Sequence, residues 1–516
     1  MSNSALGIDG QVGAAQEISA LLHRPVYERS LNPVSNGLLF LAGDGEHRLY
    51  LLTTSPDALG LQLAMQPVTW RGKAAWLGVG LTDHSNALRL RTLLPFTAPV
   101  RLGVRKGAGL GDRLGLATPG HVRAMRHTTG IVPVYAQQSI REMERTNRTP
   151  EQVLDDATWG VLQEGWRSGY GADADHLKTT EDIDRCVAAG YVMYTFDPRD
   201  QVDNAAETAD VSNLRQKYTA LPWARLGTTA EDTYTRYAGQ SWDLGGGHLL
   251  VMGESDLLRA ACKYGAALAH IRDLYAHLRD TIGDRPWEVE VSVDETDTPT
   301  RPIEHWFIAR ELRRLGVDWV SLAPRYVGRF EKGVDYIGDL DAFEQDWAWH
   351  VAIARALGPY KLSLHSGSDK FSIYPIAARH AGELIHLKTA GTSYLEALRA
   401  IARLDPAFFR EILAYAILNY EYERRSYHVS AELARVPDPV ALPDEELPAL
   451  LDAFDARQVL HVTFGVVLSC TGSEGETVYR DRFYALLEQH EEAHYAALET
   501  HLTRHVMPFS DQGREG

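Results

Sequence analysis

The first part of the chain consists of short apolar runs separated by turn residues. Leu38–Leu41 and Leu49–Leu52 are two such runs, with the turn pair Asp44-Gly45 between them, and Ala75–Val79 is a later one. Runs of this length, bounded by turn residues, are typical of strands joined by tight connections. Residues 1–94 are therefore predicted to form a β-rich N-terminal portion.

A different rhythm begins at about residue 95, where apolar runs that end in polar residues alternate with helical patterns. Glu304–Leu315 is a typical helical pattern and is followed by the stop residue Gly316. Eight alternating strand and helix units that close on themselves make a (β/α)8 barrel. The chain is thus predicted to belong to the α/β class, with a TIM-type barrel over residues 95–470 as its catalytic domain. The candidate strands are residues 100–104, 130–136, 169–173, 190–196, 287–293, 318–323, 360–365 and 383–387.

Three regions depart from a simple barrel. Residues 198–286, between the fourth and fifth candidate strands, are predicted to form a mostly helical insertion. Residues 471–516 are predicted to form a helical C-terminal extension, in which the charged run Glu488–Arg504 is expected to present a solvated face. The first strand, 100–104, is weak, and His461–Leu468 is an alternative for its place in the barrel.

Composition and charge restrict the class of partner. The net charge of −17 argues against nucleic acid, which is itself anionic. The residues Met1–Gly7 lack the features of an export signal, and no 18-residue apolar run occurs, so we expect a cytoplasmic protein without a membrane segment. The three scattered cysteines do not indicate a disulfide framework. A small-molecule substrate is the expected partner, and no pattern in the chain defines an oligomeric state.

Three of the candidate strand ends carry a histidine with a lysine close behind it. These histidines are His176, His365 and His386. Imidazoles that converge from different strands at the mouth of a barrel suit a divalent metal, and zinc, manganese, nickel or iron would each accept them. We predict one such metal, bound by the three histidines. The alternative for each histidine alone is a hydrogen-bonded residue without a metal.

Carboxylates accompany the histidines. Asp175 precedes His176, where it suits a general base or a hydrogen-bond partner of a ligand. Asp294 and Glu295 follow an apolar strand in which alternation turns Glu290 inward, so they are predicted to lie at the same mouth. Capping of the next helix is the alternative role for Asp294 and Glu295. The three predicted catalytic residues are Asp175, Asp294 and Glu295.

Polar and cationic residues near these strand ends are candidates for substrate binding. The segment Ser366–Lys370 fits neither a phosphate-binding loop nor a nucleophile elbow, but its hydroxyls and amides suit sugar hydroxyls or a carboxylate. The segment Gly107–Gly115 also misses the nucleotide-binding templates and is predicted to be a loop from which an arginine reaches the site. The predicted substrate-binding residues are Arg113, Lys178, Arg325, Ser366, Ser368, Asp369, Lys370 and Lys388.

Several of these motifs resemble the tagaturonate/fructuronate epimerase family over roughly residues 36–470. The resemblance implies a metal-dependent barrel enzyme that interconverts D-tagaturonate and D-fructuronate, two ketohexuronates that differ at one hydroxyl-bearing carbon. Relatives are also used on fructose and tagatose, so the acid group of the substrate is an inference. The matching motifs are Gly111–His121, Val134–Arg141, Asp173–Lys178, Val291–Glu295, Leu364–Phe371 and His386–Gly391.

The position of the inverted carbon suggests the mechanism. That carbon is β to the ketone, so its C–H bond is not acidified, and direct deprotonation is unfavourable. A retro-aldol cleavage followed by an aldol step on the opposite face solves this problem, with a metal acting as Lewis acid. We predict that Asp175 accepts the hydroxyl proton and that Asp294 or Glu295 donates it back.

Three lysines complete the predicted chemistry, and three alternative functions remain. Lys178, Lys370 and Lys388 would neutralise the substrate carboxylate and the enediolate. The alternatives are a ketohexose 4-epimerase, a lysine-dependent aldolase and a carbohydrate-binding barrel without turnover. Clustered histidines and carboxylates argue against the last, since a binding cleft needs few titratable groups.

Overall fold

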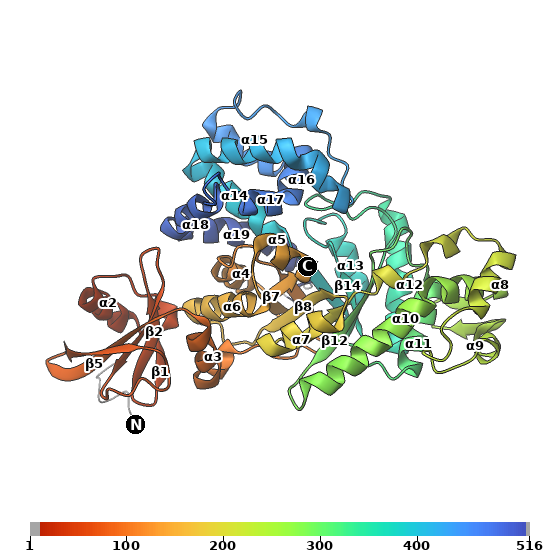
Figure 1. The fold of residues 1–516 in the computed structure, drawn as a ribbon, viewed down its shortest axis with the longest axis horizontal. Helices are drawn as coiled ribbons and strands as arrows, with labels where there is room; N and C mark the ends of the chain where they lie inside the picture. The colour runs from red at the N-terminus through yellow and green to blue at the C-terminus, as the bar shows by residue number, and fades with distance from the viewer. Residues whose placement is uncertain (1–10, 512–516) are drawn as a thin grey trace.

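The computed structural model describes residues 11–511, and its centre is a closed barrel of eight parallel strands (Figure 1). This confirms the predicted α/β class and the (β/α)8 TIM-type barrel. The N-terminal residues on which the predicted lack of an export signal rests lie outside the described part of the chain. The barrel strands are β6 (Gly107–Leu110), β7 (Val132–Ser139), β8 (Gly171–Leu177), β9 (Met193–Phe196), β12 (Glu288–Val293), β13 (Ser321–Pro324), β14 (Lys361–Leu364) and β15 (Ile385–Thr389).

The first barrel strand is the glycine-rich segment Gly107–Leu110, so two predictions about this part of the chain were wrong. Residues 100–104 do not form a strand, and the first four residues of the segment 107–115, which was predicted to be a loop, pair with β15 and β7. A Cβ on Gly107 would lie 2.4 Å from His386 Nδ1, and one on Gly109 would lie 2.8 Å from Gln137 Oε1. Glycine is therefore required in this strand, because the large polar side chains of its neighbours occupy the space beside it.

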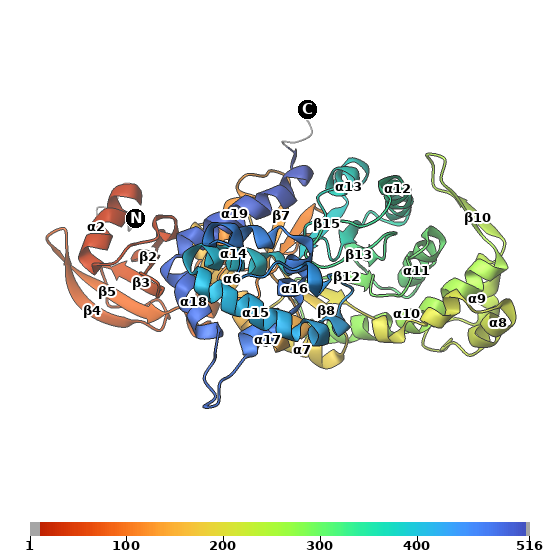
Figure 2. The same ribbon diagram turned by 90° about the horizontal axis from the view of Figure 1, so that it is seen from above.

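Helices cover the outside of the barrel (Figures 1 and 2). The outward residues Val289 and Val291 of β12 are fully buried beneath them, as alternation along the strand predicts. Several of these helices begin with a capping box, for example where Ser139, Thr149 or Thr179 accepts a hydrogen bond from the third helical residue. The helices are α4 (Thr118–Met125), α5 (Ile140–Thr146), α6 (Pro150–Glu164), α7 (Thr180–Ala189), α10 (Glu254–Ile282), α11 (Pro302–Arg314), α12 (Leu340–Leu357) and α13 (Tyr374–Ala381).

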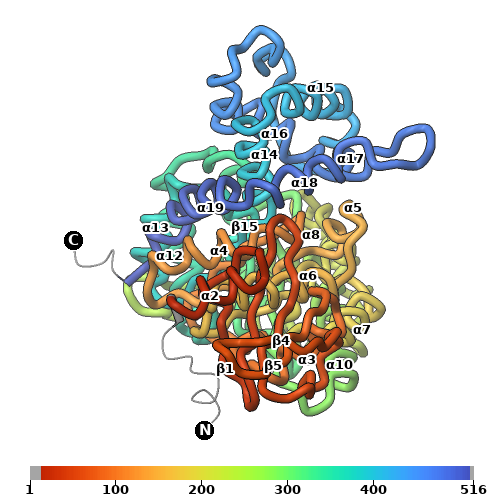
Figure 3. The backbone as a smooth tube through the Cα atoms, turned by 90° about the vertical axis from the view of Figure 1, so that its left-hand side faces the viewer, coloured from red at the N-terminus to blue at the C-terminus, as the bar shows by residue number. Residues whose placement is uncertain are grey.

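The N-terminal residues form an antiparallel sheet that lies beside the barrel (Figure 1) and faces the viewer in Figure 3. The strands Gly37–Ala42 and Arg48–Thr53 are buried on both faces, because each face of the sheet is covered by helices. Helix α2 (Gln11–Leu22) covers one face, whereas α3 (His84–Leu93) and the barrel helix α6 cover the other. The strands, in the order 1-2-3-5-4, are β1 (Asn32–Val34), β2 (Gly37–Ala42), β3 (Arg48–Thr53), β4 (Ala64–Trp70) and β5 (Lys73–Leu81).

The insertion between β9 and β12 projects from the side of the barrel (Figure 2). It contains the helices α8 (Val211–Thr219) and α9 (Ala230–Tyr237) before the long helix α10. A two-stranded hairpin, β10 (Gln240–Asp243) and β11 (Leu249–Met252), adds strand structure to the predicted helical insertion.

The residues after β15 form a helical layer with its own apolar core. The segment His461–Leu468, the alternative barrel strand, lies in two helices of this layer. The charged terminal run is solvated on one side only, because His494 and His501, and His505 just beyond the run, are buried where α19 packs on α4 and α14. No helix within residues 11–511 is long and apolar enough to cross a membrane. The helices are α14 (Thr392–Leu404), α15 (Pro406–Glu423), α16 (Phe454–Val462), α17 (Phe464–Ser469), α18 (Arg480–Gln489) and α19 (Glu491–Val506).

Candidate active site

A cavity of about 270 Å³ lies at the carboxyl ends of the barrel strands. Barrel enzymes carry their active sites at this end. A second cavity of about 540 Å³ adjoins the first and shares several of its lining residues. The strand ends contribute Gln137, Asp175, His176, Asp294, His365 and Lys388 to the first cavity.

Asp175 and His176 both face this cavity, although neighbouring residues of a strand normally point to opposite faces. The register between β8 and β9 shifts between Ala174 and Leu177, and His176 has a left-handed φ of 56°. This bulge turns the imidazole toward the cavity beside the carboxylate of Asp175. A left-handed backbone at a residue other than glycine costs about 1–3 kcal/mol and tends to be found at functional sites.

Asp175, His176 and His365 form a group that could hold a metal ion, since their ligand atoms all lie within 4.8 Å of one another. His176 Nδ1 lies 2.9 Å from Asp175 Oδ1. Nδ1 of His176 and Nδ1 of His365 are buried and make no hydrogen bond of good geometry among the described residues, although they lie 2.9 and 3.4 Å, respectively, from a carboxylate oxygen. Nε2 of His365 instead pairs with Glu290, an arrangement in which a carboxylate orients a metal-binding imidazole. One carboxylate and two imidazoles fit zinc, manganese, nickel or iron.

His386, the third predicted metal ligand, is not part of this group. It is paired in register with Ser363 of β14 and Gly107 of β6, and His365 lies two residues beyond Ser363. Two residues along a strand correspond to roughly 6.6 Å, so His386 lies one layer deeper in the barrel than His365. Burial lowers the pKa of His386 to about 3. The residue of β15 that reaches the mouth is Lys388.

Lys388 lies among three carboxylates. Its Nζ is 2.7 Å from Asp173, 2.8 Å from Asp175 and 2.7 Å from Glu290, and it donates to Thr195 Oγ1 at 2.9 Å. Burial opposes the charge of Lys388, but these carboxylates raise its pKa well above the usual value. Lys388 is therefore a permanent cation that holds together the acidic residues under the candidate metal group.

The pKa of Asp175 lies well below its usual value. Burial alone would raise the pKa, but His176 and Lys388 stabilise the carboxylate. The same carboxylate raises the pKa of the His176 imidazole to about 9, against the effect of burial. An ionised Asp175 is a good cation ligand, and its place in the group with His176 and His365 favours metal binding over proton transfer for this residue.

Asp294 and Glu295 also line the cavity, as predicted from their position after β12. Asp294 accepts a hydrogen bond from Ser292 at 2.5 Å and lies 3.4 Å from His365 Nδ1. Glu295 pairs with Arg199 and lies 3.9 Å from His176 Nε2. Both carboxylates therefore border the group that could hold a metal.

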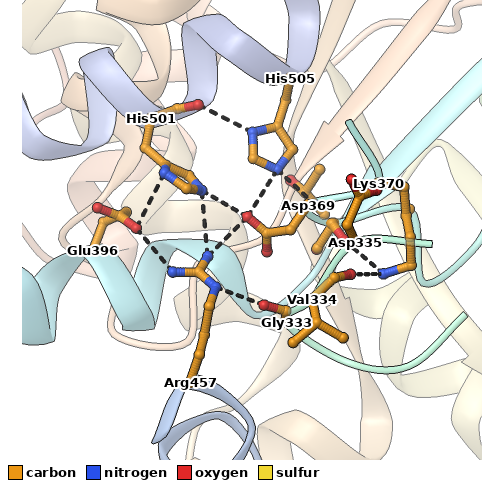
Figure 4. Close-up of polar contacts among 12 residues, drawn as sticks. Gly333, Val334, Asp335, Asp369, Lys370, Glu396, Arg457, His501 and His505 are labelled. Atoms are coloured by element: carbon orange, nitrogen blue, oxygen red, sulfur yellow. Dashed lines mark hydrogen bonds and ion pairs between the residues drawn. The ribbon is translucent and has the colours of Figure 1, made fainter. Parts of the chain in front are cut away.

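Asp369 lies outside the cavity, in a network that ties the loop after β14 to α19 (Figure 4). Its Oδ1 is 2.8 Å from Arg457 and 2.7 Å from His501, and its backbone N–H donates to His505 Nε2. The ligand atoms of Asp369, His501 and His505 also lie within 4.8 Å of one another. However, the guanidinium of Arg457 already neutralises Asp369, and Nε2 of His505 already accepts a hydrogen bond from the backbone N–H of Asp369. This second group therefore suits a structural network better than a metal.

The other predicted substrate-binding residues divide between the cavity and its surroundings. Lys370 is not in the cavity lining, because its ammonium is buried and donates to the carbonyls of Glu331, Val334 and Ser368. Burial lowers the pKa of Lys370 to about 7. Arg325 lines the adjoining cavity. The predicted residues that do line the first cavity are Arg113, Lys178, Ser366, Ser368 and Lys388.

Several cavity residues were missed by the sequence analysis. Lys332 belongs to a charged segment that resembles an exposed loop, and Arg141 closes the motif that begins at Val134. Tyr427 and His461 come from the helical layer, far from the barrel strands in sequence. The pattern of strands and helices carries no signal that brings these last two residues to the mouth.

The fold and the site define a barrel enzyme with a carboxylate and imidazole centre at its mouth. The sequence model of the tagaturonate epimerase family matches residues 27–508, and the chain belongs to this family. It is therefore an enzyme of the isomerase class. The tagaturonate/fructuronate epimerase of Thermotoga maritima is 41% identical over 481 residues, which cover 93% of this chain and 96% of that protein.

Solved structures show the same fold. The native crystal structure of the fructuronate-tagaturonate epimerase UxaE from Cohnella laeviribosi matches with a TM-score of 0.88 and 37% identity, over 96% of this chain and 99% of that one. A crystal structure of the same enzyme complexed with one glycerol matches equally well, with a TM-score of 0.88, 37% identity and the same coverage. These findings confirm the family suggested by the sequence motifs.

Proposed function

We propose that this enzyme is a metal-dependent epimerase that interconverts D-tagaturonate and D-fructuronate. Membership of the tagaturonate epimerase family supports the substrate pair. The observation that carries the metal dependence is the convergence of Asp175, His176 and His365 beside Asp294 and Glu295 in one cavity. The anionic composition and the family's metabolic role support a cytoplasmic location.

In this proposal Asp175, His176 and His365 would hold one divalent cation. A bound cation supplies Lewis acidity toward the ketone and hydroxyl oxygens. Glu290 fixes the ring of His365, and Lys388 balances the charge of the acidic residues beneath the site. In this proposal the third metal ligand is Asp175 and not His386, which was predicted from the sequence.

Proton transfer then falls to Asp294 and Glu295. With Asp175 as a ligand, one of these two carboxylates accepts the proton of the β-hydroxyl group while the carbon–carbon bond opens. The electron pair of that bond becomes an enediolate, and the aldehyde fragment turns to present its other face. Re-formation of the bond and return of the proton complete the inversion, and the roles exchange in the reverse direction.

The environment of Lys388 argues against this residue as the Schiff-base lysine of an aldolase. A lysine that forms a Schiff base must be neutral, whereas three carboxylates hold Lys388 in its charged form. A neutral ketohexose such as fructose remains a second candidate substrate, because the proposed steps do not involve the acid group.

Incubation of the purified enzyme with a ketohexuronate or a ketohexose tests the proposal. We expect the ketohexuronate epimer to accumulate, its formation to stop with a chelator, and activity to return when zinc, manganese, nickel or iron is added. Turnover that survives complete metal removal would refute the metal dependence. Absence of any epimer with metal present would refute the activity and favour a binding protein.

A further inference from the structure

The cationic side chains of the cavity differ in how they are neutralised. Four of them pair with carboxylates: Arg113 with Glu142 at 2.8 Å, Lys178 with Asp200 at 2.9 Å, Arg199 with Glu295, and Lys388 with its three acidic neighbours. Lys332 and Arg141 also line the cavity. Within residues 11–511, Lys332 has no carboxylate within ion-pair distance, and Arg141 approaches one only at 3.9 Å from Glu295.

The side chain of Lys332 is partly buried and lines the cavity beside the candidate metal group. Its Nζ donates to Ser366 Oγ at 2.7 Å, and Ser366 directly follows His365. Burial lowers the pKa of Lys332, and the neighbouring Arg141 lowers it further, although Asp294 acts in the opposite direction. Two partly buried cations that repel each other are stabilised when an anion binds between them.

The backbone on both sides of Lys332 is held by two buried cations, Lys370 and Arg457, whose contacts with Val334 and Gly333 appear in Figure 4. Lys370 donates to the carbonyls of Glu331 and Val334, at 2.8 and 2.5 Å. Arg457 donates to the carbonyl of Gly333 at 2.6 Å. The loop is therefore fixed before substrate arrives, and a fixed cation loses less entropy on binding an anion than a mobile one.

Arg141 has a defined position as well. It is the second residue of α5, and its guanidinium carbon lies 5.2 Å from the centre of the Tyr427 ring. Its side chain is 39% exposed, so a substrate can reach it from the open side of the cavity. A guanidinium that lies over an aromatic ring retains its donors for a carboxylate.

We propose that Lys332 and Arg141 bind the carboxylate of the substrate and thereby make the enzyme select a ketohexuronate over a neutral ketohexose. This inference rests on the proposed epimerase function and adds the residues that decide its substrate class. In this arrangement Lys370 and Arg457 are positioning residues, which act through the loop that carries Lys332.

The test compares two substrates with each variant. For Lys332→Met and Arg141→Gln we expect kcat/KM for the ketohexuronate to fall about 10- to 100-fold, chiefly through KM, because each removes a hydrogen bond to a charged group. The value for fructose or tagatose should stay unchanged. Arg329→Gln is the matched control, since it removes an exposed cation from the same loop that pairs with Glu331.

Equal losses on the acid and the neutral sugar, or an unchanged value for the ketohexuronate, would overturn the assignment while leaving the epimerase function intact. A wild-type enzyme without epimerase activity on either sugar would instead refute the proposed function and the assignment with it. If Lys332→Met does not fold, as judged by circular dichroism, Arg141→Gln carries the test, because its side chain is more exposed.

Discussion

Oδ1 of Asp175 lies 2.9 Å from Nδ1 of His176, although the two residues are neighbours in a β-strand. A regular strand would direct one of them into the barrel and the other toward the surrounding helices. The bulge at the end of β8 removes this restriction and brings a carboxylate and an imidazole to one point. The proposed metal site depends on this local departure from regular structure.

Replacement of the proposed ligands should remove the metal. We expect His176→Ala and His365→Ala each to lose the bound divalent cation, because two remaining ligands hold it weakly. Metal content after dialysis, measured by mass spectrometry, checks this. His386→Gln is the matched control and should keep its metal, since His386 lies one layer deeper. Loss of metal in the control as well as in both alanine variants would restore the ligand set predicted from sequence.

Replacement of the proposed acid and base should stop the reaction without removing the metal. We expect Asp294→Asn and Glu295→Gln each to lower kcat by about 10²- to 10⁴-fold, which is the usual contribution of a positioned acid or base. Metal content and thermal unfolding should match those of the wild type. Near-normal turnover of either variant would exclude that residue from proton transfer.

Carbon–carbon cleavage predicts a particular isotope pattern. When the enzyme turns over a ketohexuronate in deuterated water, the inverted carbon should stay unlabelled, because its C–H bond never breaks. Nuclear magnetic resonance of the product measures this directly, and traces of three-carbon fragments should escape during long incubations. Stoichiometric deuterium at the inverted carbon would show that the reaction proceeds by proton exchange instead.

Buried His121 should make stability depend on pH. Burial lowers its pKa from 6.5 to about 4, and its Nε2 lies 2.7 Å from Ser393 Oγ. The unfolded chain therefore binds a proton at this residue below about pH 6.5, whereas the folded protein does so only near pH 4. The free energy of unfolding should decrease as the pH falls through this window, by at most about 3 kcal/mol from His121.

Urea unfolding at pH 7 and pH 4.5 measures this dependence. The variant His121→Gln cannot titrate, so the difference between its two unfolding free energies should be smaller than that of the wild type. An equal difference in both proteins would mean that other groups account for the acid sensitivity.

Strand periodicity predicted the parts of the site that depend on one strand alone. Alternation in β12 correctly placed Glu290 inside the barrel, and the polar ends of β8 and β14 identified Asp175, His176 and His365 as residues of the mouth. These predictions needed only the direction of a side chain and the end of a strand. Both are local properties, so the sequence contains them.

The sequence by itself determined the barrel, its eight-fold alternation and several of the residues at its mouth. Only the tertiary structure decided that His386 lies below the site, because depth depends on the register of β15 against β14 and β6. It also decided that Lys332 reaches the cavity, since Lys370 and Arg457 fix its loop from elsewhere in the chain. Register and long-range anchoring arise from contacts between segments that are distant in sequence, and periodicity within one segment cannot encode them.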